Sequence, residues 1–315
     1  MHTIFLDQNK WIELARVYAG TVKSGPSCVA YEQLVSAVSA NRIVCPLTIS
    51  HIVETAKRHD PVSRSHVAEV QARLSKGHVF RSRKARLLIE MRNALHMAFG
   101  EEVVALPKNW AVVPGFRQSF EDYDMLVASP EAAAKTKLLN EHLDPAQQYI
   151  DYMLHQDDGR RRMALTAFEA ESRALLGRIE ARRTIMRGST IDLRWRAYAA
   201  KLFLDNQGFV AHMLDVIGHN IDQMKSLGGE VIVEFIRNVP TLNVEAELTA
   251  RLESQTGPLE VNDIRDMLSF YTAVPYAQRM VAEKGFVSLS RQAKLDIRYG
   301  VALSTKLEEV IGLYE

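Results

Sequence analysis

The order of hydrophobic and polar positions at the start of the chain predicts a short buried strand that leads directly into a helix. Residues 4–6 are apolar, Asp7 follows them, and Trp11, Leu14 and Tyr18 then recur at helical spacing. Ligands of open α/β sheets collect outside the carboxyl ends of the strands, so an acid here is well placed to hold a metal ion. The alternative is that Asp7 caps the helix, because Asp is a frequent N-cap residue.

The same pattern occurs again further along the chain. Residues 42–47 are rich in β-forming side chains and predict a second strand, after which Thr48 or Ser50 offers an N-cap for a helix. Glu54 lies in the first or second turn of that helix. The chain therefore carries a second acid shortly after a strand.

The middle of the chain has a different character. From about residue 60 to residue 228 the apolar residues repeat at helical spacing, most clearly over 160–187. Residues 105–129 contain prolines and a glycine and are interpreted as an irregular connection. The pattern predicts an all-helical middle region, and it contains no repeat of fixed period.

The last segment returns to a mixed pattern. Asn262 is a suitable N-cap for a helix over 263–273, and residues 279–282 predict another strand. We interpret residues 286–289 as a further extended run and residues 303–313 as a closing helix. The strands are therefore expected at the two ends of the sequence, with helices between them.

Three more acids stand at the edges of these last elements. Asp263 and Asp266 are three residues apart and share a helix face near its N-terminus, while Glu283 follows the strand over 279–282. Taken singly, each acid is more often a cap or a solvated charge, and a helix N-terminus favours anions. Several carboxylates that converge without a cation are costly to assemble, and they usually coordinate a hard cation such as Mg²⁺ or Mn²⁺.

Composition narrows the class of protein. The 315 residues suffice for one large or two ordinary domains, and the formal net charge of +1 gives no global field that attracts nucleic acid. Two cysteines are too few for a disulfide framework, as expected in a reducing compartment. No apolar run approaches the roughly 20 residues of a membrane span, and acids interrupt the N-terminal stretch where a signal peptide is apolar. We expect a soluble, cytoplasmic protein with no membrane partner.

Four stretches in order resemble the motifs of PIN-domain nucleases. Residues 6–12 (LDQNKWI) resemble the opening motif, an acid after the first strand with an Asn two residues on. Residues 46–54 (PLTISHIVE) resemble the second, and residues 262–266 (NDIRD) with 274–284 (VPYAQRMVAEK) resemble the third and fourth. The resemblance implies an α/β, PIN-like three-layer core with a short, mainly parallel sheet.

The resemblance covers only the two ends of the chain. It implies a discontinuous nuclease core formed by residues 1–60 and 228–315, interrupted by a large all-helical insertion domain over residues 61–227. The expected activity is divalent-metal-dependent hydrolysis of phosphodiesters by an endoribonuclease, acting as a toxin or defence effector. Nothing in the sequence separates RNA from DNA as the nucleic-acid partner.

The resemblance also implies roles for individual residues. Asn9 positions a water or a ligand carboxylate, with a turn residue as the alternative, and Asp263 is an alternate ligand or supports one. Gln278 stands where many PIN-like proteins carry an acid, so it binds a metal weakly or holds a water. Four carboxylates are expected to hold one or two Mg²⁺ or Mn²⁺ ions: Asp7, Glu54, Asp266 and Glu283.

The predicted insertion is rich in arginine. Basic clusters at 81–86, 160–162 and 178–187 are suited to follow a nucleic-acid backbone, but acids interleave with them, which favours ordinary solvated helix faces. The alternative to a nuclease is an inactive PIN-like scaffold, disabled by Gln278, whose insertion binds a protein partner or forms a homo-oligomer. A competent site would be stabilised by Mn²⁺, whereas a scaffold would not.

Overall fold

The structure, a computed structural model, describes residues 1–155 and 157–314, without the side chains of residues 158, 160 and 161. The chain is an α/β protein with a four-stranded parallel sheet and many helices, which confirms the predicted class and the parallel strands. The order of the strands in the sheet is β2-β1-β5-β6. These strands are β1 (His2–Leu6), β2 (Ile43–Val44), β5 (Arg279–Val281) and β6 (Ala302–Ser304).

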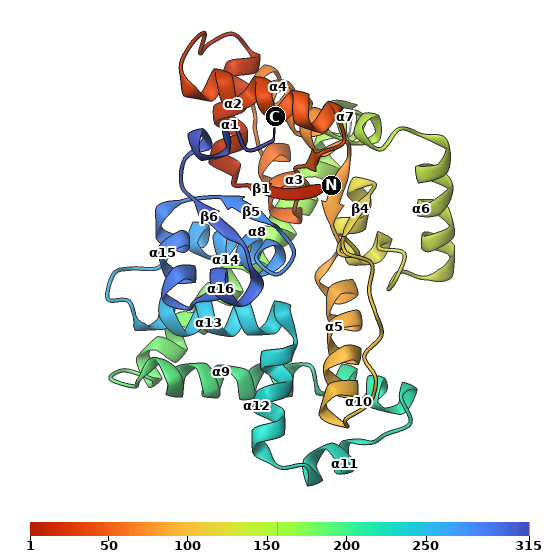
Figure 1. Ribbon diagram of the computed structural model, residues 1–315, viewed down its shortest axis with the longest axis vertical. Helices are drawn as coiled ribbons and strands as arrows, with labels where there is room; N and C mark the ends of the chain where they lie inside the picture. Colours follow the sequence, from red (N-terminus) through yellow and green to blue (C-terminus); the bar gives the residue numbers. More distant parts are fainter. Residues whose placement is uncertain (156, 315) are drawn as a thin grey trace.

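Helices cover both faces of the sheet (Figure 1). Successive side chains of a strand point to opposite faces, so Ile4 and Leu6 enter one hydrophobic core while Phe5 enters the other. All three are fully buried, which stabilises the fold by about 1.5–3 kcal/mol for each side chain. The first core is completed by α1 (Gln8–Tyr18), α2 (Pro26–Ser39) and α4 (Pro61–Ser75), and the second by α13 (Pro240–Ser254), α14 (Val261–Ala273) and α15 (Lys284–Gln292).

A third core lies among helices away from the sheet. Helix α13 joins it to the second core, because Val244 and Leu248 face the sheet side while Leu242 and Ala246 face the other helices. The helices that contribute to the third core are α5 (Arg83–Ala98), α9 (Ile191–Asp205), α10 (Gln207–Val216), α11 (Ile221–Ser226) and α12 (Gly229–Asn238).

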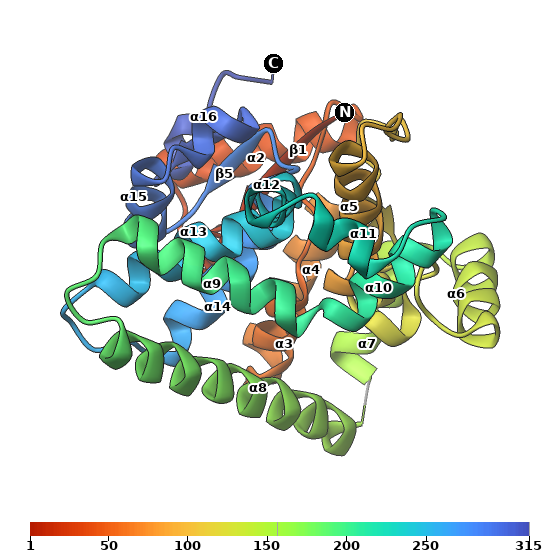
Figure 2. The same ribbon diagram turned by 90° about the horizontal axis from the view of Figure 1, so that it is seen from below.

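The longest helix, α8 (Asp158–Ile185), runs along the underside of the molecule (Figure 2). It packs against α14 and against α3 (Ile49–Ala56), the two helices that carry Asp266 and Glu54. Part of the predicted insertion is therefore in direct contact with the predicted site. The remaining elements are α6 (Pro130–His142), α7 (Pro145–His155), α16 (Leu295–Tyr299) and the 3₁₀ turns η1 (Phe116–Ser119), η2 (Glu121–Tyr123) and η3 (Leu307–Val310).

The prediction of an all-helical middle region is wrong in one place. Two short antiparallel strands lie within it, β3 (His78–Phe80) and β4 (Val112–Pro114). Strand β3 also exchanges two backbone hydrogen bonds with Leu47, at 2.9 and 3.0 Å, which form an isolated parallel bridge between this two-stranded sheet and the segment after β2. The buried Val79 and Phe80 and the free backbone groups of Leu47 favour this pairing over another helix.

Two predictions for the C-terminal segment are also wrong. Residues 286–289 belong to α15, because Phe286, Val287 and Leu289 bury one face of a helix against the sheet. Residues 302–304 form strand β6 instead of starting a helix, and only the 3₁₀ turn η3 follows them. The edge of the sheet offers Leu303 a parallel partner in Met280, which the local sequence does not reveal.

The division into core and insertion remains a prediction. Helix α4 packs on α1 beside the sheet, and α12 packs on α5 and α9 in the third core, so packing crosses both predicted boundaries. Among the described residues, no helix combines the length and the apolar character that crossing a membrane requires.

Candidate carboxylate site

Asp7 and Glu283 lie side by side at the carboxyl edge of the sheet. Strands β1 and β5 are parallel neighbours, with Leu6 paired to Val281, and the backbone N–H of Asp7 donates to the carbonyl of Val281 at 2.9 Å. Each acid then begins the helix that follows its strand, Asp7 before α1 and Glu283 before α15. The parallel register therefore brings together two acids that are far apart in the sequence.

Asp7 caps a helix, as one of its two interpretations predicts, and its role as a metal ligand remains a prediction. Its Oδ1 accepts a hydrogen bond from the backbone N–H of Gln8 at 2.7 Å, which caps α1. The carboxyl group is also 93% buried, and burial raises its pKa from 3.8 to about 6, against the opposing effect of backbone hydrogen bonds from Gln8 and Glu283. The charge of Glu283 raises the pKa further. Asp7 is thus a cap that also faces another acid.

Glu54 and Asp266 reach the same edge from two helices that pack against each other, α3 and α14. Burial raises the pKa of Glu54 to about 7, and the charge of Asp7 adds to the shift. Burial likewise raises the pKa of Asp266 to about 8, and the charges of Asp7, Glu283 and Glu54 follow in that order. Asp266 thus lies within electrostatic range of the other three predicted ligands, and Asp7 lies within range of Glu54 and Glu283.

Two of the accessory residues lie beside this group of four carboxylates. The side-chain amide of Asn9 donates to Oε1 of Glu283, so Asn9 orients a site carboxylate, as the resemblance implies. Asp263 is one helical turn from Asp266, but its Oδ2 accepts from the backbone N–H of Glu260 at 2.7 Å. Asp263 therefore acts as a helix cap, and its charge adds only a small rise to the pKa of Asp266.

The placement of Gln278 at the site is corrected by the structure. Gln278 precedes β5, whereas Glu283 follows it, and at about 3.3 Å per residue the strand keeps the two apart. Its Oε1 accepts from the backbone N–H of Thr3 at 2.6 Å, and its own N–H donates to the carbonyl of Thr3 at 2.9 Å. Gln278 therefore pairs with the amino end of β1, and its neutral side chain removes no charge from the carboxylates.

The nearest cations are bound to other acids. Lys57 and Arg265 both contact Oε1 of Glu169 on α8, at 2.9 and 3.3 Å, and Lys10 pairs with Glu13 at 3.7 Å. The charges of Arg265 and Lys57 lower the pKa of Glu54 without a direct bond to it. Glu169 was not found by sequence reasoning, because nothing local distinguishes it from other acids on α8.

The donor set fits a hard divalent cation. Four carboxylates, three of them desolvated enough to raise their pKa, are the oxygen ligands that Mg²⁺ and Mn²⁺ prefer. In the described part of the chain, however, no three or more His, Cys, Asp or Glu side chains already have the spacing of a metal site. Electrostatic repulsion between the carboxylates raises their pKa values at distances longer than those of metal coordination, so the shifts do not require the spacing of a metal site.

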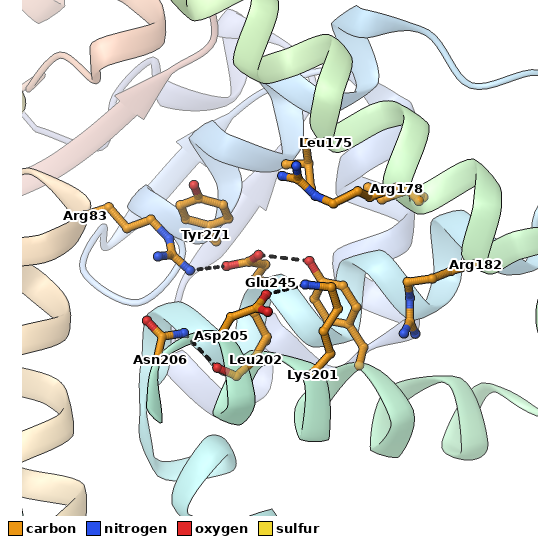
Figure 3. A pocket seen from close by; sticks show the side chains of 12 residues that line it. Arg83, Leu175, Arg178, Arg182, Lys201, Leu202, Asp205, Asn206, Glu245 and Tyr271 are labelled. Atoms are coloured by element: carbon orange, nitrogen blue, oxygen red, sulfur yellow. Dashed lines mark hydrogen bonds and ion pairs between the residues drawn. The ribbon is translucent and has the colours of Figure 1, made fainter. Parts of the chain in front are cut away.

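Three arginines of the basic clusters in the middle region are paired with acids. Arg83 bonds Glu245 at 2.8 Å and Arg182 bonds Glu253 at 2.6 Å, around a cavity of about 480 Å³ between α8, α9 and α13 (Figure 3). Arg81 pairs with the fully buried Asp124 at 2.7 Å. The expectation of solvated helix faces is therefore wrong for these three residues: Arg83 and Arg182 join helices, and Arg81 joins the connection before α5 to Asp124. Within the cluster 160–162, the side chains of residues 160 and 161 lie outside the described part of the chain.

Sequence reasoning also missed a group of cations beside Glu54. Lys57, Arg58 and His59 lie three to five residues after Glu54 and line a second, smaller cavity. Their run of three basic residues after a predicted ligand was a usable signal.

Comparisons with protein-family models, with curated proteins and with solved structures found no match to this chain.

Proposed function

We propose that this protein is a divalent-metal-dependent phosphodiesterase of the PIN-like type that cleaves RNA in the cytoplasm. The observation that carries the proposal is the meeting of four acids from four separate elements at the carboxyl edge of one parallel sheet. This edge is where α/β proteins bind their ligands. The RNA substrate and the cytoplasmic location rest on the resemblance of the motifs.

Each residue has a defined part in this proposal. The ion would be held by the carboxylates of Asp7, Glu54, Asp266 and Glu283, where it lowers the pKa of a bound water and offsets charge on the phosphate. Asn9 fixes one oxygen of Glu283 through its amide. The backbone N–H groups of Gln8 and Glu283 favour the charged form of Asp7 and offset part of the effect of burial on its pKa. These contacts pre-orient the ligands, as polar partners of metal sites commonly do.

The test is cleavage of a labelled single-stranded RNA with Mn²⁺, with Mg²⁺ and with EDTA. We expect cleavage with either ion, none with EDTA, and a loss of at least about 100-fold in Glu54→Gln, since loss of a group around a metal ligand already costs 10–100-fold. Glu32→Gln is the control, because Glu32 is an exposed acid on α2. Equal cleavage by both variants, or cleavage in EDTA, would contradict the proposal.

A non-catalytic scaffold is the second candidate, and one observation favours it. Helix α6 buries only Thr136 and exposes Leu138 by 56%, and Leu143, which follows the helix, is 51% exposed. An apolar surface of this kind suits a protein partner or a second copy of the chain. A scaffold predicts no stabilisation by Mn²⁺, so melting temperatures with and without Mn²⁺ separate the two functions.

A further inference from the structure

A cleft beside Glu54 is lined by cations and by no acid. It has a volume of about 310 Å³ and lies between the end of α3, the start of α4 and the first turns of α8. Like charges around a concave surface repel one another, and an anion in the cleft relieves this repulsion. The residues that line the cleft are Ala56, Lys57, Arg58, His59, Arg64, Arg162 and Leu165.

The cleft has a fixed donor at its base. Arg64 is 92% buried, its Nε donates to the carbonyl of Met153 at 3.0 Å, and its Nη1 donates to the carbonyl of Arg58 at 2.7 Å. These two bonds hold the guanidinium plane in place, and Nη2 has no partner among the described residues. A rigid guanidinium with a free N–H pair is suited to a phosphate oxygen.

The cations at the rim are only partly neutralised. Arg162 has no ion-pair partner in the part of the chain that the structure describes, whereas Lys57 is paired with Glu169. Arg58 donates only to the hydroxyl of Ser63, at 3.1 Å. The cleft therefore has more positive charge than its surroundings balance.

The cleft is adjacent to the carboxylate site. Lys57 and Arg58 are three and four residues after Glu54, one turn further along the same chain segment, and Glu169 bonds both Lys57 and Arg265. Lys57 and Arg58 therefore lie close to one of the four predicted metal ligands, and their charges act on Glu54. A strand of nucleic acid presents a second phosphate at such a position, because its phosphates repeat along the chain.

We propose that this cleft binds a phosphate group of single-stranded nucleic acid next to the phosphodiester that the carboxylates cleave; the second half of this statement rests on the proposed function. The cleft is at the small end of ligand-binding cavities, so it admits a phosphate on a flexible strand and excludes a duplex. Arg64 contacts the phosphate at the base while Arg162 and Arg58 contact it from the rim.

The test measures binding of a labelled single-stranded RNA in EDTA, where no cleavage occurs, over a range of salt concentrations. Arg162→Glu is compared with Lys135→Glu, which makes the same charge change at an exposed position on α6. We expect Arg162→Glu to weaken binding roughly tenfold, as for loss of a charged hydrogen bond, and Lys135→Glu to leave it unchanged. The slope of log affinity against log salt should fall by about 0.7 for each phosphate that the variant no longer neutralises.

The other possible results test the phosphate site and the proposed hydrolysis separately. If Arg162→Glu and Lys135→Glu bound RNA with equal affinity and equal salt dependence, the proposed phosphate site would be wrong. It would also be wrong if duplex RNA bound as tightly as single-stranded RNA. His59→Gln, a second exposed change, guards against misfolding of Arg162→Glu and should weaken binding in the same direction. Binding that depends on the cleft, together with no cleavage in Mn²⁺, would overturn the proposed hydrolysis and leave the phosphate site intact.

Discussion

Among single residues, Asp266 has the largest upward pKa shift of the site carboxylates, and this makes its effect on stability depend on pH. Its pKa in the folded protein is about 8, against 3.8 for an unperturbed Asp, because of burial and then the charges of Asp7 and Glu283. The folded state therefore binds a proton that the unfolded state has lost between about pH 4 and pH 8. Within this window the free energy of unfolding falls as pH rises.

Asp266→Asn removes this titration, so in EDTA we expect it to stabilise the protein at pH 8 relative to wild type, by on the order of 2 kcal/mol. At pH 4.5 the two proteins should differ much less, since wild-type Asp266 is then protonated. Denaturant unfolding at the two pH values measures the difference. A variant that is less stable than wild type at pH 8 would contradict the raised pKa of Asp266.

The residue scale also separates what the sequence determines locally from what it does not. The positions of Asp7 and Glu283 could be predicted because each directly follows a recognisable strand. A residue directly after a parallel strand lies at the carboxyl edge of the sheet. Gln278 was misplaced because a three-residue strand leaves few positions between its two ends, so a small shift moves a side chain to the opposite edge. Arg162 could not be assigned to the cleft, because about a hundred residues separate it from Lys57.

At the scale of elements, helix α8 is attached to the rest of the molecule by ion pairs as well as by apolar contacts. Glu253 on α13 is fully buried and accepts from Arg182 of α8 at 2.6 Å, with Arg194 of α9 at 3.9 Å. Removing the carboxylate of Glu253 leaves Arg182 and Arg194, whose side chains are largely buried, without their counter-ion. Such a loss is far more costly than the net value of the pair.

We therefore expect Glu253→Gln to lower the free energy of unfolding by about 3 kcal/mol. Glu247→Gln is the matched control on the same helix, where loss of the partly exposed pair with Arg251 should cost less than about 1 kcal/mol. Urea unfolding of both variants gives the comparison. Similar values for the two would show that the buried pair contributes no more than a surface one.

The elements that were misassigned share a physical cause. Residues 286–289 and 302–304 have short apolar runs that fit either a strand or a helix, and tertiary partners decide between them. Strand β6 forms because β5 offers an open parallel edge, and α15 forms because its apolar face covers the second core. Long periodic helices such as α8 and α14 were predictable, since many residues repeat the same signal.

At the scale of the whole molecule, a divalent ion would connect the sheet to helices on its two sides. Its four ligands follow β1 and β5 or lie on α3 and α14, and α8 packs on both of these helices. An ion that binds only the folded state stabilises it by mass action, by about 2.7 kcal/mol when its free concentration is 100 times its Kd. It also offsets the like-charge repulsion that raises the pKa values of Asp266 and Glu54.

We expect Mn²⁺ to raise the melting temperature of the wild-type protein and to leave that of Asp7→Asn unchanged. The rise should be larger at pH 8 than at pH 6, because the carboxyl groups must lose their protons to bind the ion, and the pKa values of about 6, 7 and 8 span this range. Ca²⁺ at the same concentration distinguishes a site that prefers small ions from one that only collects charge. A wild-type melting temperature that is the same in EDTA and in Mn²⁺ at pH 8 would contradict the metal site, and the exposed apolar surface of α6 would then become the first place to look for a partner.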